Sequence, residues 1–558
     1  MLSNGRYSAY KDIKVGLKLW CMVQKNKIIL ACGLLVFLFA FIIYLDSLRN
    51  GFLAGDDEEI ILRNIYLRDW RNFYKFFTRN LKDGSGVVCN YYRPFQLLIY
   101  GIIVKTIGIK PWPFHFASIL FHALCGLLLY LLFLRLFYHK ANLTMLTLMA
   151  LLWLSLPIHN EELAGATGLA SPTYTFWMLL GILSFLYYGD RQKFKWYIIS
   201  LLSFILSLFS KESAVIFPGL LLGVYLACVK AGILKKMPFK RFVTIFLPFC
   251  IITFIYIVLR LTLLNFSNTL NFYSEANIFT ESFFCRIYTL FPILVRGLVI
   301  IFFPVGLHPE KSWPVFINFF IPQVVLSFLI LAILVILAVI YWNKRPLFTL
   351  GIFWFFFSYF PMSNLIAKIN ALVWDHWLYA PSIGILLSLT TLMEKRPVQK
   401  LAYFFLIIMI IIFTPLTYVR SRYYRDTESV SRFILSYEPG SAKTWNNLGI
   451  ALAEKNKYQE AIDSYTKAIE VEDIYPQTHH NLANAYIALG KYDLAEKEYL
   501  KAIEMDSHFF HSYLALGKFY LSRGQREKAR EFFKKTLDIY PDCSEAKEFL
   551  KDNSLIVR

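Results

Sequence analysis

The C-terminal part of the chain repeats itself every 34 residues. Four positions of the repeat keep the same kind of residue. A leucine recurs at Leu448, Leu482 and Leu516; a small residue at Gly449, Ala483 and Gly517; an alanine at Ala461, Ala495 and Ala529; and an aromatic residue at Tyr465, Tyr499 and Phe533. A repeat of this length, with small residues at fixed positions, predicts pairs of helices that stack side by side and bury a continuous core. The pattern therefore predicts an α-helical superhelix for this part of the chain.

This period is that of the tetratricopeptide repeat. We expect repeats at about 442–475, 476–509 and 510–543, preceded by a half-repeat at about 421–439 and followed by a short capping helix near 543–551. Arrays of this kind present a concave groove to another chain and very rarely carry out chemistry. The expected role of residues 420–558 is therefore protein docking.

The part before the repeats is dominated by apolar segments. Hydrophobic residues make up 57% of the chain and charged residues only 17%, a composition typical of polytopic membrane proteins. Eleven segments are candidate membrane spans: 27–45, 112–135, 143–158, 171–188, 196–210, 213–230, 242–261, 319–341, 347–363, 378–393 and 400–418. We expect a basic tail at 1–26 and a membrane domain at 27–419.

The formal net charge of +20 belongs to the membrane part. From Arg420 onward there are 21 basic and 21 acidic residues, so the excess does not indicate a nucleic-acid partner. With the N-terminus inside, the inner segments hold 21 basic and 3 acidic residues, whereas the outer segments before the repeats hold 16 and 14. The positive-inside rule therefore predicts that the first loop, 46–111, and the repeats lie on the non-cytoplasmic side.

Two further apolar stretches, 94–109 and 286–303, are interrupted or flanked by Lys or Arg and lie beside proline. We expect both to be helices at the outer interface rather than spans. No small-residue cleavage site follows the first span, which predicts an anchor rather than a removed signal peptide. The eight cysteines show no zinc spacing, and a bridge between Cys89 and Cys285 is one arrangement the predicted topology allows.

Ionisable residues gather at the predicted outer ends of the spans. The run Asp56 to Glu59 follows the first span, and Arg93, Glu161, Lys211 and His376 lie at other outer span ends. Charges of both signs on one face could hold an anionic lipid phosphate and deprotonate a hydroxyl group. The alternatives are a solvated acidic helix start for the run, and snorkelling side chains for Arg93 and Lys211.

Several of these segments resemble the transmembrane and tetratricopeptide repeat proteins, which are O-mannosyltransferases, and their bacterial relatives. The resemblance covers nearly the whole chain, and its motifs are fairly specific only when taken together. The matching segments are Asn50-Gly51-Phe52 through Asp56-Asp57 with Asn64 and Trp70, "LPIHNEELAGATG" at 156–168, "KES" at 211–213, "PMSN" at 361–364 and "DHWLYAPSIG" at 375–384.

The resemblance implies an all-α fold of the GT-C type, in which a membrane enzyme transfers a sugar from a polyprenyl-phosphate carrier with inversion. Carried over by position, Asp56 is the expected general base and Asp57 supports it or shares its proton. Glu161 is expected to orient the acceptor or a metal ion. The resemblance implies no particular cofactor beyond the polyprenyl-phosphate sugar donor, and a divalent cation could bind at such a site.

The resemblance also implies cationic partners for the leaving phosphate. Arg93, Lys211 and His376 are the candidates, because cations stabilise the charge that develops there. The chain departs from the family at three positions. Leu169 and Ser171 stand where the family usually has Arg and then an acid, and His376 replaces an Arg. A histidine at this position would add sensitivity to pH.

A protein acceptor is expected to bind the repeats. Asn447 and Asn481 occupy equivalent positions on the first helices of two repeats and could hydrogen-bond an extended peptide. The third repeat has Ala515 at this position, and a packing role for the two asparagines is equally open. We expect an integral membrane glycosyltransferase, with the repeats in the periplasm of a bacterium or in the endoplasmic reticulum lumen of a eukaryote. The alternatives are a non-catalytic scaffold and a transporter or polymerase of lipid-linked glycans, which intramembrane charges at mid-span would favour.

Overall fold

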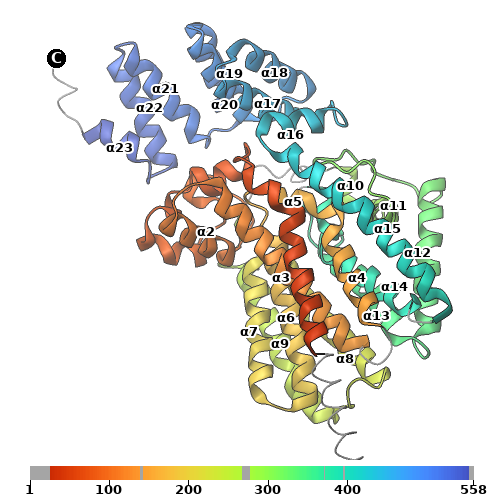
Figure 1. Cartoon of the computed structure of the whole chain (residues 1–558). Helices are drawn as coiled ribbons and strands as arrows, with labels where there is room; N and C mark the ends of the chain where they lie inside the picture. Colours follow the sequence, from red (N-terminus) through yellow and green to blue (C-terminus); the bar gives the residue numbers. More distant parts are fainter. Residues whose placement is uncertain (1–25, 138–141, 267–276, 370, 394–395, 552–558) are drawn as a thin grey trace, which may run out of the picture. The chain divides into compact units, whose positions relative to one another are not determined.

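The computed structural model describes residues 26–137, 142–266, 277–369, 371–393 and 396–551 (Figure 1). Every regular element within these ranges is helical, which confirms the predicted all-α fold. The chain divides into two compact units. The membrane unit comprises the residues up to Gly51, Ile60–Leu307 and Trp313–Arg422, and the repeat unit comprises Phe52–Glu59, His308–Ser312 and the residues from Tyr423 onward.

The membrane unit begins with the helix Asn26–Arg49. Its further long helices are α2 (Pro94–Thr106), α3 (Pro111–Phe137), α4 (Leu143–Ser155), α6 (Ala170–Arg191), α7 (Phe194–Ser210), α8 (Phe217–Lys230), α9 (Phe239–Leu261), α11 (Phe283–Phe302), α12 (Pro322–Tyr341), α13 (Pro346–Tyr359), α14 (Pro381–Met393) and α15 (Arg396–Ser421). Short helices α5 (Asn160–Ala164) and α10 (Ile278–Glu281) connect them. The core of this unit includes the fully buried Trp153 and Trp354.

Seven helices in the described part of the chain are long and apolar enough to cross a membrane. The chain is therefore an integral membrane protein. Six of these helices overlap predicted spans. Of the other five predicted spans, 143–158, 196–210, 347–363 and 378–393 form a bent pair or helices shorter than 18 residues, and 171–188 forms α6, which has 22 residues but is not one of the seven. The number of eleven spans stays a prediction, because length and composition alone do not decide which short helices cross.

The two stretches predicted to lie at the interface differ in length. The first forms α2, which has 13 residues and is too short to span a bilayer when straight. The second forms α11, which has 20 residues and the hydropathy of a spanning helix. Arg286 and Arg296 do not shorten α11, because it contains both of them within one continuous helix.

Helices α13 and α14 cross at their glycines. A Cβ atom on Gly351 would overlap the carbonyl oxygen of Gly384, and a Cβ atom on Gly384 would overlap the carbonyl oxygen of Gly351. Small residues let the backbones of membrane helices approach closely and gain van der Waals contact. This crossing fixes the start of α14, which follows the segment that carries His376.

The repeat unit consists of helices that pack as antiparallel pairs. Its helices are α16 (Thr427–Leu435), α17 (Ala442–Glu454), α18 (Tyr458–Val471), α19 (Pro476–Ala488), α20 (Tyr492–Met505), α21 (Phe510–Ser522), α22 (Arg526–Ile539) and α23 (Ser544–Lys551). Within each pair, the small residue of the first helix meets the aromatic ring of the second. A Cβ atom on Gly449 would overlap Tyr465, and one on Gly517 would lie 2.8 Å from Phe533.

Candidate functional site

The acidic pair Glu161 and Glu162 lies where a helix breaks. Helix α4 ends at Ser155 because Pro157 cannot continue it, and the chain resumes as α5 after a bend of 43°. The Asn160 side chain donates to the Thr417 carbonyl oxygen at 2.8 Å, which ties α5 to α15. Gly168 packs against the backbone of Glu162, where a Cβ atom would overlap the Glu162 carbonyl oxygen. These contacts hold the two carboxylates in place.

Glu162 belongs to a buried chain of hydrogen bonds. The Lys211 Nζ atom donates to the Ser171 Oγ atom at 2.7 Å, and the Ser171 hydroxyl donates to the Glu162 carboxylate. Lys211 also lies 3.5 Å from the Glu162 Oε1 atom, and the side chains of Lys211 and Glu162 are only 8% and 9% exposed. Burial lowers the pKa of the Lys211 amine below its ordinary value, although Glu162 offsets part of this effect.

Glu161 holds the segment that carries His376. Its Oε1 atom lies 3.0 Å from the Nδ1 atom of His376, and its Oε2 atom accepts the His376 backbone N–H at 3.3 Å. The other ring nitrogen of His376 lies 3.9 Å from Glu162. The preceding residue, Asp375, is buried and pairs with Arg296 at 2.9 Å. Glu161 therefore contacts His376, whereas Glu162 lies between Lys211 and the other side of the His376 ring.

Arg93 joins the same region through the residue after Lys211. Its Nε atom lies 3.4 Å from the Glu212 carboxylate, which also accepts the Tyr92 backbone N–H at 2.9 Å. The guanidinium of Arg93 also lies over the ring of Tyr91, 4.5 Å from its centroid. The structure thus brings Glu161, Lys211, His376 and Arg93 into one charged cluster within the membrane unit.

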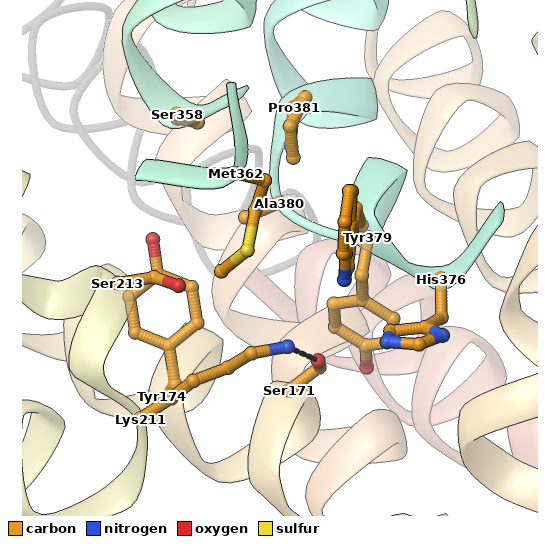
Figure 2. A pocket seen from close by; sticks show the side chains of 11 residues that line it. Ser171, Tyr174, Lys211, Ser213, Ser358, Met362, His376, Tyr379, Ala380 and Pro381 are labelled. Carbon is orange, nitrogen blue, oxygen red and sulfur yellow. Dashed lines mark hydrogen bonds between the residues drawn. The ribbon is translucent and has the colours of Figure 1, made fainter. Parts of the chain in front are cut away.

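A pocket opens beside this cluster (Figure 2). It is lined by Ser171, Tyr174, Lys211, Ser213, Ser358, Met362, His376, Trp377, Tyr379, Ala380 and Pro381. The hydroxyl groups of Tyr174, Ser213 and Ser358 are buried and have no hydrogen-bond partner in the described part of the chain. Buried polar groups are normally paired, so these three hydroxyls are available to bind water molecules or a polar ligand.

Asp56 and Asp57 belong to the repeat unit, in a segment that we name the acidic loop (Phe52–Glu59). The chain turns at Gly55, which has a φ of +92°. The buried Asp57 accepts the Leu53 backbone N–H at 2.9 Å across this turn, whereas Asp56 is exposed. The two acids therefore differ, since Asp57 is buried and holds the loop, whereas Asp56 is exposed.

The two predicted acceptor residues lie on neighbouring repeats. Asn447 is half-buried on α17, and Asn481 lies on α19. The Asn481 side chain donates to the Asn446 side chain at 3.0 Å, so the contact between these repeats uses the residue before Asn447. This bond gives Asn481 a packing role, which the sequence left open.

Sequence reasoning missed several members of the cluster. Glu162 and Glu212 are not among the site residues that the sequence predicts, and Ser171 enters only as a departure from a motif, although it bridges Lys211 and Glu162. Their position next to chosen residues was the available signal. Cys89 and Cys285 are both free, so the bridge between them is not formed. Among the described residues, no group of three or more His, Cys, Asp or Glu side chains is placed to hold a metal ion.

The fold and the cluster define a polytopic membrane protein with a charged site and a C-terminal tetratricopeptide array. Residues 442–473 and 475–542 match family models described as tetratricopeptide repeat. The chain is 24% identical over 444 residues to Protein O-mannosyl-transferase F38B6.6 of Caenorhabditis elegans, an alignment that covers 78% of this chain and 62% of that protein. It is 32% identical over 127 residues to Protein O-mannosyl-transferase TMTC4 of Homo sapiens, which covers 22% of this chain and 17% of that protein.

These relatives confirm the resemblance to the transmembrane and tetratricopeptide repeat proteins, and the chain spans less than two thirds of their length. Two solved structures are similar to part of the chain. The first repeat domain of Spaghetti (RPAP3) bound to an HSP90 peptide is 27% identical and covers 21% of this chain and 92% of its own, with a TM-score of 0.20. The MamA protein is 26% identical, and the match covers 21% of this chain and 64% of the MamA chain, with a TM-score of 0.19.

Proposed function

We propose that the protein is a glycosyltransferase that moves a mannosyl group from a polyprenyl-phosphate carrier to a hydroxyl group of a protein, on the non-cytoplasmic side of the membrane. The names of the relatives support the class of reaction and the kind of acceptor. The observation that carries the proposal is the pocket of the membrane unit, which is lined by the Lys211 amine, the His376 imidazole and three hydroxyls without a hydrogen-bond partner in the described part of the chain.

The pocket suits the phosphate of the donor. Lys211 and His376 supply positive charge where negative charge develops as the bond between sugar and phosphate breaks. The hydroxyls of Tyr174, Ser213 and Ser358 can donate to phosphate or sugar oxygens. Glu161 and Glu162 fix the positions of the two cations, so little reorganisation is needed when the donor binds. Arg93 does not line the pocket, but it adds positive charge nearby and pairs with Glu212.

Asp56 is the proposed general base. The acceptor hydroxyl gives its proton to the Asp56 carboxylate as its oxygen attacks the anomeric carbon from the side opposite the phosphate. The bond from that carbon to the phosphate oxygen breaks, and polyprenyl phosphate leaves with the electron pair, which inverts the anomeric centre. Asp57 serves this step by holding the turn at Gly55. The repeats, with Asn447 and Asn481 on their first helices, are the proposed docking surface for the acceptor.

Transfer from a radiolabelled polyprenyl-phosphate mannose to a peptide, by the purified protein in lipid nanodiscs, tests the proposal. We expect Asp56→Asn to lower kcat by about 10²- to 10⁴-fold, because general-base catalysis is lost. Tyr174→Phe should instead raise KM for the donor, whereas Tyr187→Phe, on the same helix but outside the pocket, should change neither constant. Full transfer by the Asp56→Asn protein, or transfer from a soluble nucleotide sugar in place of the lipid donor, would contradict the proposal.

A further inference from the structure

Two loops of the membrane part of the sequence fold as part of the repeat unit. The acidic loop follows the first apolar helix, and the segment His308–Ser312, which we name the clamp loop, lies between α11 and α12. The clamp loop contacts residues 437–444 around the start of α17. The acidic loop contacts α16 and lies near the end of α17. The first repeat is therefore more than the start of a docking array.

The clamp loop binds the beginning of α17 through Glu310. The Glu310 carboxylate accepts hydrogen bonds from the hydroxyls of Ser441 and Thr444 at 2.9 and 2.7 Å, and it pairs with the Lys443 amine at 2.6 Å. Burial alone would raise the pKa of the Glu310 carboxyl, but Lys443 and the two hydroxyls hold it below its ordinary value. A carboxylate beside the N-terminus of a helix also gains from the helix dipole.

Further contacts of the clamp loop involve the turn before α17. Ser312 donates to the Glu438 carboxylate from its backbone N–H at 3.1 Å and from its hydroxyl at 2.5 Å. The ring of His308 stacks on that of Tyr437, with 4.8 Å between centroids and 15° between planes. The clamp loop is therefore fixed at several points on residues 437–444.

The acidic loop binds α16. The Ala54 backbone N–H donates to the Thr427 hydroxyl oxygen at 2.9 Å, and Thr427 is only 6% exposed. The next residue, Glu428, pairs with Lys455 at 2.6 Å, which joins α16 to the end of α17. Burial raises the pKa of Glu454 at that helix end, and Glu58 of the acidic loop raises it further, so the loop lies close to the first repeat.

We propose that α16 and the first repeat are a positioning element, which holds the acidic loop and thereby fixes Asp56 for the reaction. This inference rests on the proposed function, since it assigns Asp56 its catalytic part. Thr427 is the positioning residue that contacts the loop, and Glu310 anchors the other end of the first repeat. The first repeat then has two tasks, because it also carries Asn447 of the proposed docking surface.

Thr427→Val tests the inference in the full-length protein, with Thr427→Ser as the matched control. Valine keeps the shape of threonine but removes the hydroxyl oxygen that accepts the Ala54 N–H, whereas serine keeps that oxygen. We expect Thr427→Val to speed hydrogen exchange in peptides that cover residues 52–59 and to lower kcat by about 10- to 100-fold, with KM for the donor unchanged. Thr427→Ser should resemble the parent protein in all three measurements.

The acceptor in this assay is a short threonine-containing peptide, so that a loss of docking to the later repeats does not lower the rate. Glu310→Ala is a second variant, for which we expect faster exchange at residues 437–444 and at 52–59. Glu504→Ala removes a carboxylate that is 73% exposed in the second repeat and should change neither segment.

Unchanged exchange at 52–59 in both Thr427→Val and Glu310→Ala would overturn the inference. Faster exchange with an unchanged kcat would also overturn it, because the loop would then be held without being positioned for catalysis. If the parent protein transfers no sugar from the lipid donor, the proposed function fails, while the exchange data still decide whether the repeat holds the loop.

Discussion

Gly449 is a residue whose missing side chain is itself a structural requirement. A Cβ atom there would overlap the ring of Tyr465, which is 2% exposed and has no space to move into. We predict that Gly449→Ala destabilises the repeat unit by about 1–3 kcal/mol, which exceeds the gain of about 1 kcal/mol in helix propensity. Urea unfolding of a fragment covering residues 423–558 measures this change. Gly440→Ala is the control, because no heavy atom lies within 4 Å of that position.

His479 is a second residue with a measurable effect, and this effect depends on pH. Its ring nitrogens lie 2.6 Å from Glu498 and 2.8 Å from Asp473. Burial lowers the pKa of His479, but the hydrogen bonds to the two carboxylates outweigh this and raise it above the ordinary value. A raised pKa in the folded state stabilises the protein below the ordinary pKa of histidine, and this stability is lost as pH rises through the folded-state pKa.

We therefore predict that His479→Gln lowers the free energy of unfolding at pH 6 by on the order of 1 kcal/mol, and by less at pH 8.5. Denaturant titrations of the same fragment at the two pH values compare the variant with its parent. An equal loss at both values would show that the imidazole acts only through its neutral form.

At the scale of elements, the crossing of α13 and α14 should tolerate no side chain. In Gly384→Ala the new methyl group would overlap the backbone of Gly351, which cannot rotate away as a side chain can. We predict a lower melting temperature in detergent and a weaker donor affinity, because α14 follows the segment that carries His376. Gly165→Ala, at a position with no heavy atom within 4 Å, should leave the melting temperature unchanged.

The elements also show how far the sequence could predict the site. The period of 34 residues predicts the helix pairs of the repeats, because each pair buries the same positions. The sequence does not distinguish the role of Glu161 from that of Glu162. The two residues are adjacent and share one sequence signal, and they differ only in the direction of their side chains. The flanking charges led to the prediction that 286–303 lies at the interface, but α11 has the length and hydropathy of a spanning helix.

At the scale of the whole molecule, long-range partners were beyond prediction. Ala54 and Thr427 are 373 residues apart, and no period or motif relates them, so the membership of the acidic loop in the repeat unit appears only in three dimensions. The run of carboxylates from Asp56 to Glu59 is a candidate site in the sequence, but the burial of Asp57 and its hydrogen bond to Leu53 distinguish it from Asp56 only in the structure.

The orientation of the protein in its membrane is a prediction for the intact molecule. We expect the exposed position Ser507, between α20 and α21, to react with a membrane-impermeant maleimide from the non-cytoplasmic side when changed to cysteine. Lys195→Cys, on a segment predicted to face inward, should react only after the membrane is opened. The exposed native Cys250 is first replaced by serine. Labelling of Ser507→Cys only in opened membranes would place the repeats in the cytoplasm and rule out the proposed sidedness.

The tight fit of Gly168 against the Glu162 carbonyl has a consequence for comparing sequences. Any other amino acid there would push α5 away, so a homologue that uses the same bend must keep glycine six positions after the acid. This pair offers a fixed reference for aligning divergent members of the group, even where the surrounding loops differ in length. A deep mutational scan should find position 168 intolerant to every replacement, alanine included.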